Sequence, residues 1–150
     1  MKVKKIFEED WHGARLETCE QNCANLNEAY AALDRLDGKR RTCVVFWVND
    51  EAVLTVGGDG EAFVVTAAYE IDVDLYTLID PRQFTGNHVS VVVGGQSGSY
   101  PSTHVVDKAM AKEAVGYFAS TARFHRNCSG SASPETRGRH TSAPLKKYRP

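Results

Sequence analysis

The sequence has no apolar run of the roughly 18 residues that a membrane-spanning helix requires. Its first ten residues, Met1 to Asp10, include no apolar stretch of the kind found in a secretory signal. Four cysteines occur in 150 residues, and without an export signal we expect reduced thiols in the cytoplasm. These absences favour a cytoplasmic protein, and a composition of 42% hydrophobic and 25% charged residues is typical of a globular domain.

Positive charge is missing from the middle of the chain. No Lys or Arg occurs between Arg41 and Arg82, whereas eight acidic residues do: Asp50, Glu51, Asp59, Glu61, Glu70, Asp72, Asp74 and Asp80. The net charge of −1 conceals this asymmetry. Residues 1–128 carry 13 Lys+Arg against 18 Asp+Glu, and residues 129–150 carry five basic residues against one acidic residue. The sequence therefore predicts an acidic body followed by a basic tail.

The cysteines and histidines follow no recognisable metal-ligand pattern. Cys19 and Cys23 are four residues apart, but no second pair at zinc-ligand spacing follows them. His88, His104 and His125 are scattered along the chain. We therefore expect neither a metal site nor a cofactor.

The hydrophobic patterns predict an α+β domain. Strand patterns occupy Val3–Phe7, Thr42–Val48, Ala52–Val56, Ala62–Tyr69, Val73–Ile79 and His88–Val93. A helix is expected from Leu26 to Leu36 after an Asn25 cap, and a second from Val106 or Asp107 to Ser120, with a loop over Gly94–Pro101 before it. Short connections favour an antiparallel meander of about five strands flanked by the two helices. Trp11 and Trp47 are interpreted as core or capping aromatics. We expect this domain to span residues 1–128 and residues 129–150 to be a disordered tail.

One segment suggests an enzyme. Gly95-Gln96-Ser97-Gly98-Ser99 follows an expected strand, as the nucleophilic serine of a hydrolase does. The hydrolase turn requires Gly-x-Ser-x-Gly before a helix, whereas this segment ends in Ser99 and continues into Tyr100-Pro101. We therefore predict no catalytic residue, and a small hydrolase or transferase using the Gly94–Tyr100 loop is the alternative.

The acidic stretch predicts a binding surface. Asp72 and Asp74 alternate along an expected strand, so both carboxylates should face the same side of the sheet. Such alternation is more typical of a solvated sheet face than of a glycosidase pair. A negatively charged face suits a basic partner, such as a protein whose groove holds nucleic acid. Nucleic-acid binding through the basic tail is a further alternative, which the acidic body would oppose.

Residues 89–124 combine a strand, a glycine loop and an alanine-rich helix. The strand and loop read Val91-Val92-Val93-Gly94-Gly95-Gln96-Ser97-Gly98-Ser99-Tyr100-Pro101, and Ala109–Thr121 follow as the helix. This arrangement resembles the bacterial Imm1 immunity-protein family, with coverage of roughly residues 2–128. Asp107 stands where that family usually has Pro, and Thr121-Ala122 replaces its Thr-Gly.

The resemblance implies a cytoplasmic, non-enzymatic inhibitor of a polymorphic toxin used in competition between bacteria. Such a protein binds the cognate C-terminal toxin domain one to one and occludes its active site, with no direct nucleic-acid or membrane contact. The toxin domain would be basic, a deaminase or nuclease. The residues expected to contact it are Asp50, Glu51, Asp59, Glu70, Asp72, Asp74, Tyr76, Gly95, Gln96, Ser97 and Tyr100, with the two tyrosines as aromatic anchors.

Overall fold

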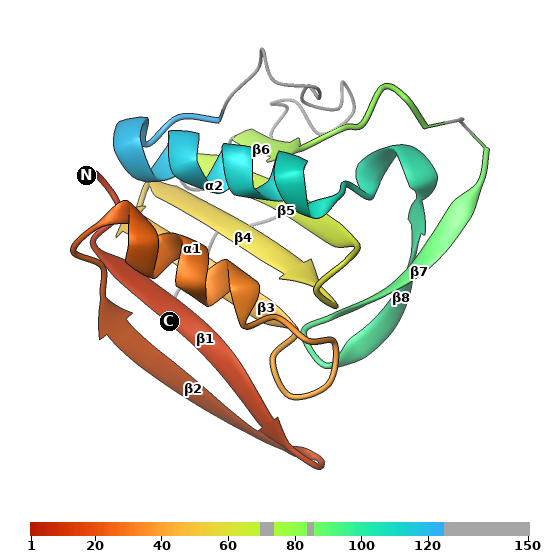
Figure 1. The fold of residues 1–150 in the computed structure, drawn as a ribbon, viewed down its shortest axis with the longest axis horizontal. Coiled ribbons are helices and arrows are strands. Elements are labelled where there is room, and N and C mark those ends of the chain that lie inside the picture. The colour runs from red at the N-terminus through yellow and green to blue at the C-terminus, as the bar shows by residue number, and fades with distance from the viewer. Residues whose placement is uncertain (70–73, 84–85, 125–150) are drawn as a thin grey trace.

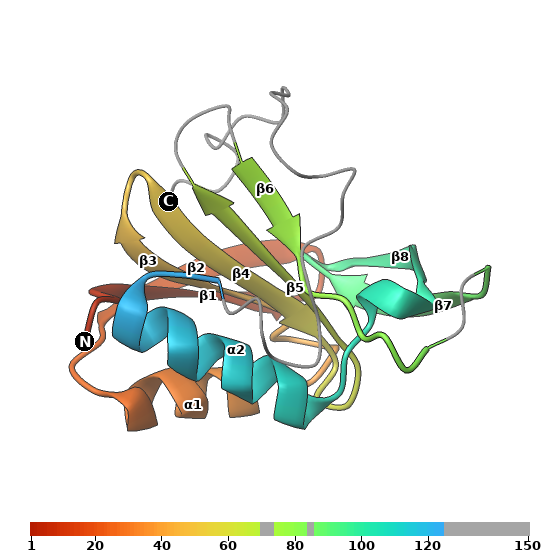
Figure 2. The ribbon, with the colours of Figure 1, turned by 90° about the horizontal axis from the view of Figure 1, so that it is seen from above.

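The computed structural model describes residues 1–69, 74–83 and 86–124. Within these ranges, a six-stranded antiparallel sheet carries two α-helices on one face, and a two-stranded hairpin lies at one end of the sheet (Figure 1). Figure 2 shows both helices beneath the sheet, on the same side. This is the predicted α+β architecture, with one strand more in the main sheet than the predicted meander and a second, smaller sheet beside it.

The elements follow one another in a simple order. They are β1 (Lys5–His12), β2 (Arg15–Asn22), α1 (Leu26–Asp34), β3 (Cys43–Asn49), β4 (Ala52–Gly58), β5 (Phe63–Tyr69), β6 (Asp74–Thr77), β7 (His88–Val93), β8 (Gln96–Pro101), a short 3-10 turn (Ser102–His104) and α2 (Lys108–Thr121). The main sheet has the order β2-β1-β3-β4-β5-β6, and β7 pairs with β8. α1 therefore carries the chain from the edge strand β2 past β1 to β3.

Both helices begin at side-chain caps, of which the sequence predicts the one at Asn25. The Asn25 carboxamide accepts a hydrogen bond from the Glu28 backbone N–H at 3.0 Å, and the Glu28 carboxylate accepts one from the Ala24 N–H at 2.6 Å. At α2, Asp107 Oδ1 accepts from the Met110 N–H at 2.9 Å. These caps place the helix starts at the predicted positions. No helix in the described ranges is both long and apolar enough to cross a membrane.

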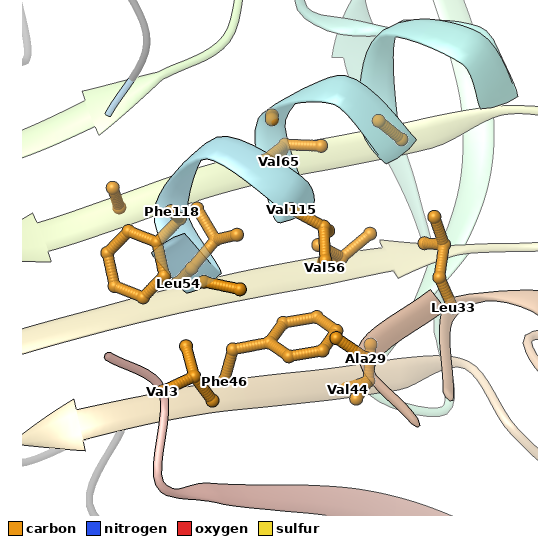
Figure 3. Close-up of a cluster of buried hydrophobic side chains, with 14 of the residues drawn as sticks. Val3, Ala29, Leu33, Val44, Phe46, Leu54, Val56, Val65, Val115 and Phe118 are labelled. Atoms are coloured by element: carbon orange, nitrogen blue, oxygen red, sulfur yellow. The ribbon is translucent and has the colours of Figure 1, made fainter. Parts of the chain in front are cut away.

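The core lies between the sheet and the helices, as Figure 3 shows. Alternate strand residues point into it, and they are fully buried where they meet α1 and α2: Ile6, Val44, Phe46, Leu54, Val56, Phe63, Val65 and Ala67. Leu33 of α1 and Phe118 of α2 pack against them. Each such aliphatic or aromatic side chain contributes about 1.5–3 kcal/mol by leaving water.

Two carboxylates share the helix-covered side of β1 with this core. Glu8 is only 5% exposed, and its carboxylate accepts hydrogen bonds from Arg35 Nε at 2.9 Å and Nη2 at 2.6 Å, as well as from Arg41 Nη1 at 3.1 Å. The Asp10 carboxylate likewise accepts two hydrogen bonds from Arg40, one from Nε and one from Nη2, both at 2.9 Å. Carboxylates of such low exposure are tolerated only when paired in this manner. The chain segment after α1 therefore closes over β1 through ion pairs.

No helix of the described residues lies on the opposite side of the sheet, and we call this side the open face. It consists of the strand residues that alternate with the core residues and form two cross-strand rows: Phe7, Val45, Thr55, Thr66 and Thr77, and Lys5, Trp47, Val53, Ala68 and Leu75. Gly57 also lies on this face, and Val93 of β7 packs directly over it. The β7–β8 hairpin therefore covers one end of the open face.

Two strands were not predicted. All eight residues of β2 are exposed, so the segment lacks the apolar alternation by which strands are recognised. The predicted loop Gly94–Pro101 is wrong, because Gly94 and Gly95, at φ of 64° and 79°, form a two-residue turn that pairs β8 with β7. Polar and glycine residues dominate β8, which is why the sequence indicated a loop.

Candidate protein-binding surface

Asp50 and Glu51 lie in the turn between β3 and β4. The Asn49 carboxamide fixes this turn by accepting the Glu51 N–H at 2.9 Å, and both acidic side chains are exposed. Asp74 begins β6 at the same end of the sheet, because it pairs with Tyr69, which in turn pairs with Ala52. We call the exposed pair Asp50 and Glu51 the acidic corner. Glu70 and Asp72, which the sequence also predicts as contacts, lie outside the described residues.

Asp59 lies at the opposite end of the sheet, in the turn between β4 and β5. Its carboxylate accepts the N–H groups of Ala62 and Glu61, both at 2.9 Å, and these two hydrogen bonds lower the pKa of Asp59. The side chain packs against Gly38 in the connection that also carries the basic run Lys39-Arg40-Arg41. Asp59 therefore does not share a surface with the acidic corner.

Few carboxylates lie on the described part of the open face. Among the described strand residues, only Glu9 of β1 and Glu20 of β2 bring a carboxylate to this side. Asp50, Glu51 and Asp59 occupy turns instead, since Asp and Asn side chains accept backbone N–H groups there, as Asn49 and Asp59 do. These three predicted contact residues therefore lie at strand ends rather than along the strands.

Trp47 lies on the open face beside the acidic corner. It pairs with Val53 in the register that brings Asn49 opposite Ala52. Its ring is partly exposed, and the Lys5 ammonium lies 5.8 Å from the ring centroid. The sequence favours a core or capping role for Trp47, but its position after the fully buried Phe46 places it on the other side of the strand.

Tyr76, expected as an aromatic anchor, belongs to the core. It is 9% exposed, and its ring lies 5.9 Å from Tyr69 and 6.3 Å from Phe124, centroid to centroid. The alternation of β6 places Tyr76 on the helix-covered side of the sheet with Leu78. Its ring is therefore not presented to a partner.

Gly95 attaches the β7–β8 turn to the sheet. Its backbone N–H donates to Thr42 Oγ1 at 2.8 Å, and the Thr42 hydroxyl donates to Glu9 Oε2 at 3.2 Å. Trp11 Nε1 donates to the same carboxylate oxygen at 3.1 Å, and the Trp11 ring packs directly against Gly95. Because a side chain at Gly95 would overlap this ring, the close approach requires glycine.

The remaining hairpin residues divide between surface and interior. Gln96 and Ser97 are exposed, whereas Tyr100 is partly buried. Burial, together with the nearby Cys43 thiol, raises the pKa of the Tyr100 phenol. Burial, with a smaller contribution from the Glu9 charge, also raises the pKa of the Cys43 thiol to about 12. A thiol in that environment stays protonated and is a poor nucleophile.

Ser97 lies within β8, opposite Val92, and not at a turn between a strand and a helix. In the part of the chain that the structure describes, its hydroxyl makes no hydrogen bond to a histidine or a carboxylate. Likewise, no three His, Cys, Asp or Glu side chains of the described residues converge as a metal site.

The chain matches no protein-family model, no curated protein and no solved structure. Its function therefore has to be inferred from its own residues. At the corner where β3 turns into β4, the exposed Asp50 and Glu51 lie near the partly exposed Trp47.

Proposed function

We propose that this chain is an immunity protein that binds a secreted bacterial toxin domain one to one and occludes its active site. The acidic corner carries the proposal. Asp50 and Glu51 are exposed there, and residues 42–81 contain no Lys or Arg that could neutralise them from the same stretch of chain. A surface of this kind suits a partner with a basic groove, as a nucleic-acid deaminase or nuclease has.

Charge and apolar contact have separate tasks in such a complex. Exposed carboxylates attract a basic partner over about 10 Å and increase the association rate, but they add little affinity once solvated. Affinity comes mainly from a few aromatic anchors that lose water on binding. Trp47 stands beside the acidic corner and is partly exposed, which makes it the candidate anchor in place of Tyr76.

The resemblance of residues 89–124 to the Imm1 family supports the same function. The β7–β8 hairpin and α2 correspond to the strand, glycine turn and helix on which the resemblance rests. Gln96 and Ser97 are exposed on that hairpin and are available to the partner. Protection of a cell requires slow release, so we expect a dissociation constant near or below the nanomolar range, about −12 kcal/mol.

Protection and inhibition are tested with the toxin domain encoded beside this chain. That domain is expressed in a bacterial host with and without the chain, and its activity is assayed in purified form against increasing amounts of the chain. We expect growth to be restored and activity to fall to zero near equimolar chain. Full activity in the presence of excess chain would overturn the proposal.

The binding surface is tested with two matched charge reversals, Glu51→Lys and Glu61→Lys. Both glutamates are exposed turn residues. In each case the backbone N–H donates at 2.9 Å to the side chain two positions earlier, Asn49 for Glu51 and Asp59 for Glu61. The two turns lie at opposite ends of the sheet. We expect Glu51→Lys to slow association with the toxin domain about tenfold at low salt and Glu61→Lys to change it less than about twofold. Biolayer interferometry at low and at high salt measures both. Equal effects would place the contact elsewhere.

A further inference from the structure

β2 is an unprotected edge strand. It is eight residues long and exposed throughout, and in Figure 1 it forms the margin of the main sheet. Its pairing with β1 runs without a bulge from His12–Arg15 to Lys5–Asn22, and it contains no proline. The other edge strand, β6, is only four residues long. Long, regular edges of this kind are templates for pairing with another chain.

The register with β1 fixes which backbone groups of β2 point outward. Cys23 N–H donates to the Lys4 carbonyl at 2.9 Å, and a two-residue turn closes the hairpin at the His12–Arg15 pair. The hydrogen bonds at both ends of the hairpin therefore show that the backbone groups of the odd-numbered residues of β2 bond to β1. The outward N–H and C=O groups belong to Leu16, Thr18, Glu20 and Asn22. No backbone group among the described residues bonds to them.

The charges on β2 do not protect this edge, because each carboxylate already has a partner in its own chain. Glu20 lies 3.0 Å from the Lys5 ammonium. Glu17 lies 3.0 Å from His12 Nε2 and 3.6 Å from Arg15 Nη2. Edges that resist pairing usually present unmatched charge, lysine above all. Here the edge is close to neutral along its length.

We propose that β2 pairs antiparallel with β2 of a second copy of this chain, with the two-fold axis at Cys19. Only registers that pair the outward residues with one another are possible. Centring the axis on Glu17 or Glu20 sets a carboxylate opposite its own copy, which charge repulsion disfavours. Centring it on Cys19 pairs Leu16 with Asn22 and Thr18 with Glu20, and so uses every outward residue in about eight backbone hydrogen bonds. Centring it on Thr18 leaves Asn22 unpaired.

The dimer joins the two main sheets into one continuous sheet. The acidic corner lies at the β3–β4 turn, and β1 separates β3 from β2, so the pairing leaves the corner of each copy accessible. A dimer would therefore bind two partner domains. The inference is independent of the proposed function, because dimerisation is measured without any toxin and inhibition is measured without regard to oligomeric state.

Cys19 provides a direct probe of the register. At a two-fold axis it lies opposite its own copy in a non-hydrogen-bonded pair, where the Cα atoms are about 4.5 Å apart, within disulfide range. Cys19 is exposed, whereas Cys23 and Cys43 are buried. In full-length protein carrying Cys128→Ser, diamide accepts the two electrons and two protons released by a pair of thiols. We expect a covalent dimer on a non-reducing gel, and none with Cys19→Ser.

The register is tested further in the Cys19→Ser, Cys128→Ser background. The double variant Glu17→Cys, Gln21→Cys should crosslink, because these positions face each other across the axis, and each single variant should not. Thr18→Cys alone should remain uncrosslinked. A crosslink through Thr18→Cys, or no Cys19-dependent dimer at all, would overturn the proposal.

Two further variants test the pairing under reducing conditions by sedimentation velocity. Thr18→Pro removes an outward N–H without removing a bond to β1, and Thr18→Glu places a carboxylate opposite Glu20 of the second copy. We expect each to raise the dimer dissociation constant at least tenfold, and Thr18→Ala to leave it within about twofold. Circular dichroism identifies any variant that fails to fold, and in that case the crosslinks decide between the two outcomes. A wild-type chain that remains monomeric at millimolar concentration contradicts the inference.

Discussion

The two sides of the main sheet are built from neighbouring residues and differ in almost every respect. Phe46 and Glu8 face the helices, where apolar packing and paired arginines enclose them. Trp47 and Glu9 are their immediate successors and face the open side. Trp47 is only partly covered there, and Glu9 accepts hydrogen bonds from uncharged donors. The comparison teaches that the helix-covered side is buried throughout, whereas the open face leaves Trp47 partly exposed beside residues such as Val53 and Ala68 that are themselves buried.

The largest expected difference is in the free energy of unfolding lost by alanine variants of Phe46 and Trp47. Phe46→Ala removes a fully buried ring from between the sheet and the helices and should lower the free energy of unfolding by about 4 kcal/mol. Trp47→Ala removes a partly exposed ring and should cost about 1 kcal/mol, while weakening toxin binding by a larger amount. Urea unfolding followed by circular dichroism measures the stability of both. Similar losses for the two variants would mean that the open face is covered as fully as the core.

A smaller difference in the free energy of unfolding is expected between removing the partner of Glu8 and neutralising Glu9. Arg35→Met leaves the buried Glu8 carboxylate with Arg41 alone and should lower the free energy of unfolding by about 2 kcal/mol. Glu9→Gln keeps an oxygen that can accept from Thr42, so it should cost less than about 1 kcal/mol. Chemical unfolding at neutral pH compares them. If Glu9→Gln proved the more damaging change, the hydrogen bonds beneath the β7–β8 turn would outweigh the ion pairs beneath α1.

The smallest effect is the response to acid, which should come from the carboxylates whose pKa is lowered in the folded chain, Asp80 and Asp10 among them. Hydrogen bonds from Arg82 lower the pKa of Asp80, and Arg40 lowers the pKa of Asp10 against the opposing effect of burial. Because both folded pKa values lie below the ordinary value near about 3.9, their stabilisation is complete above that value. It is lost as the pH falls through the depressed values.

Urea midpoints between about pH 6 and about pH 2 measure this response. Asp80→Asn should flatten the decline at the acid end. The matched change Asp50→Asn, at an exposed turn of the acidic corner, serves as the control. An equal flattening with Asp50→Asn would show that general charge repulsion, rather than the Asp80–Arg82 pair, governs acid sensitivity.

Much of the fold could be predicted from local signals. Asn25 and Glu28 indicated the start of α1, and the apolar runs of β3 to β5 with short connections between them indicated a meander, because these patterns depend on residues adjacent in sequence. β2 could not be recognised, since an exposed strand held by a single neighbour needs no apolar residues. β8 was hidden for a related reason, as its glycine turn and polar residues also fit a loop.

Some predicted contact residues are exposed and others are buried, depending on whether local or long-range interactions determine their position. Turn acids such as Asp50 and Glu51 are exposed because the turn chemistry that places them is local. Tyr76 required the pairing of β6 with β5 and the packing of α2 before its side of the strand was known. For Trp47 the sequence left a core and a capping role open, because an aromatic residue in an apolar run gives no sign of which face of the sheet the helices will cover.

The sequence by itself determined the α+β class, the two helix starts and a stretch of 40 residues without a basic side chain, all of which follow from composition and short-range pattern. Only the tertiary structure decided which side of the sheet is covered, where the acids meet and which edge is exposed. Strand order and register bring Asp50 to the same end as Asp74 and set Asp59 at the other. Such juxtapositions arise from hydrogen bonds between residues distant in sequence, and no local pattern encodes them.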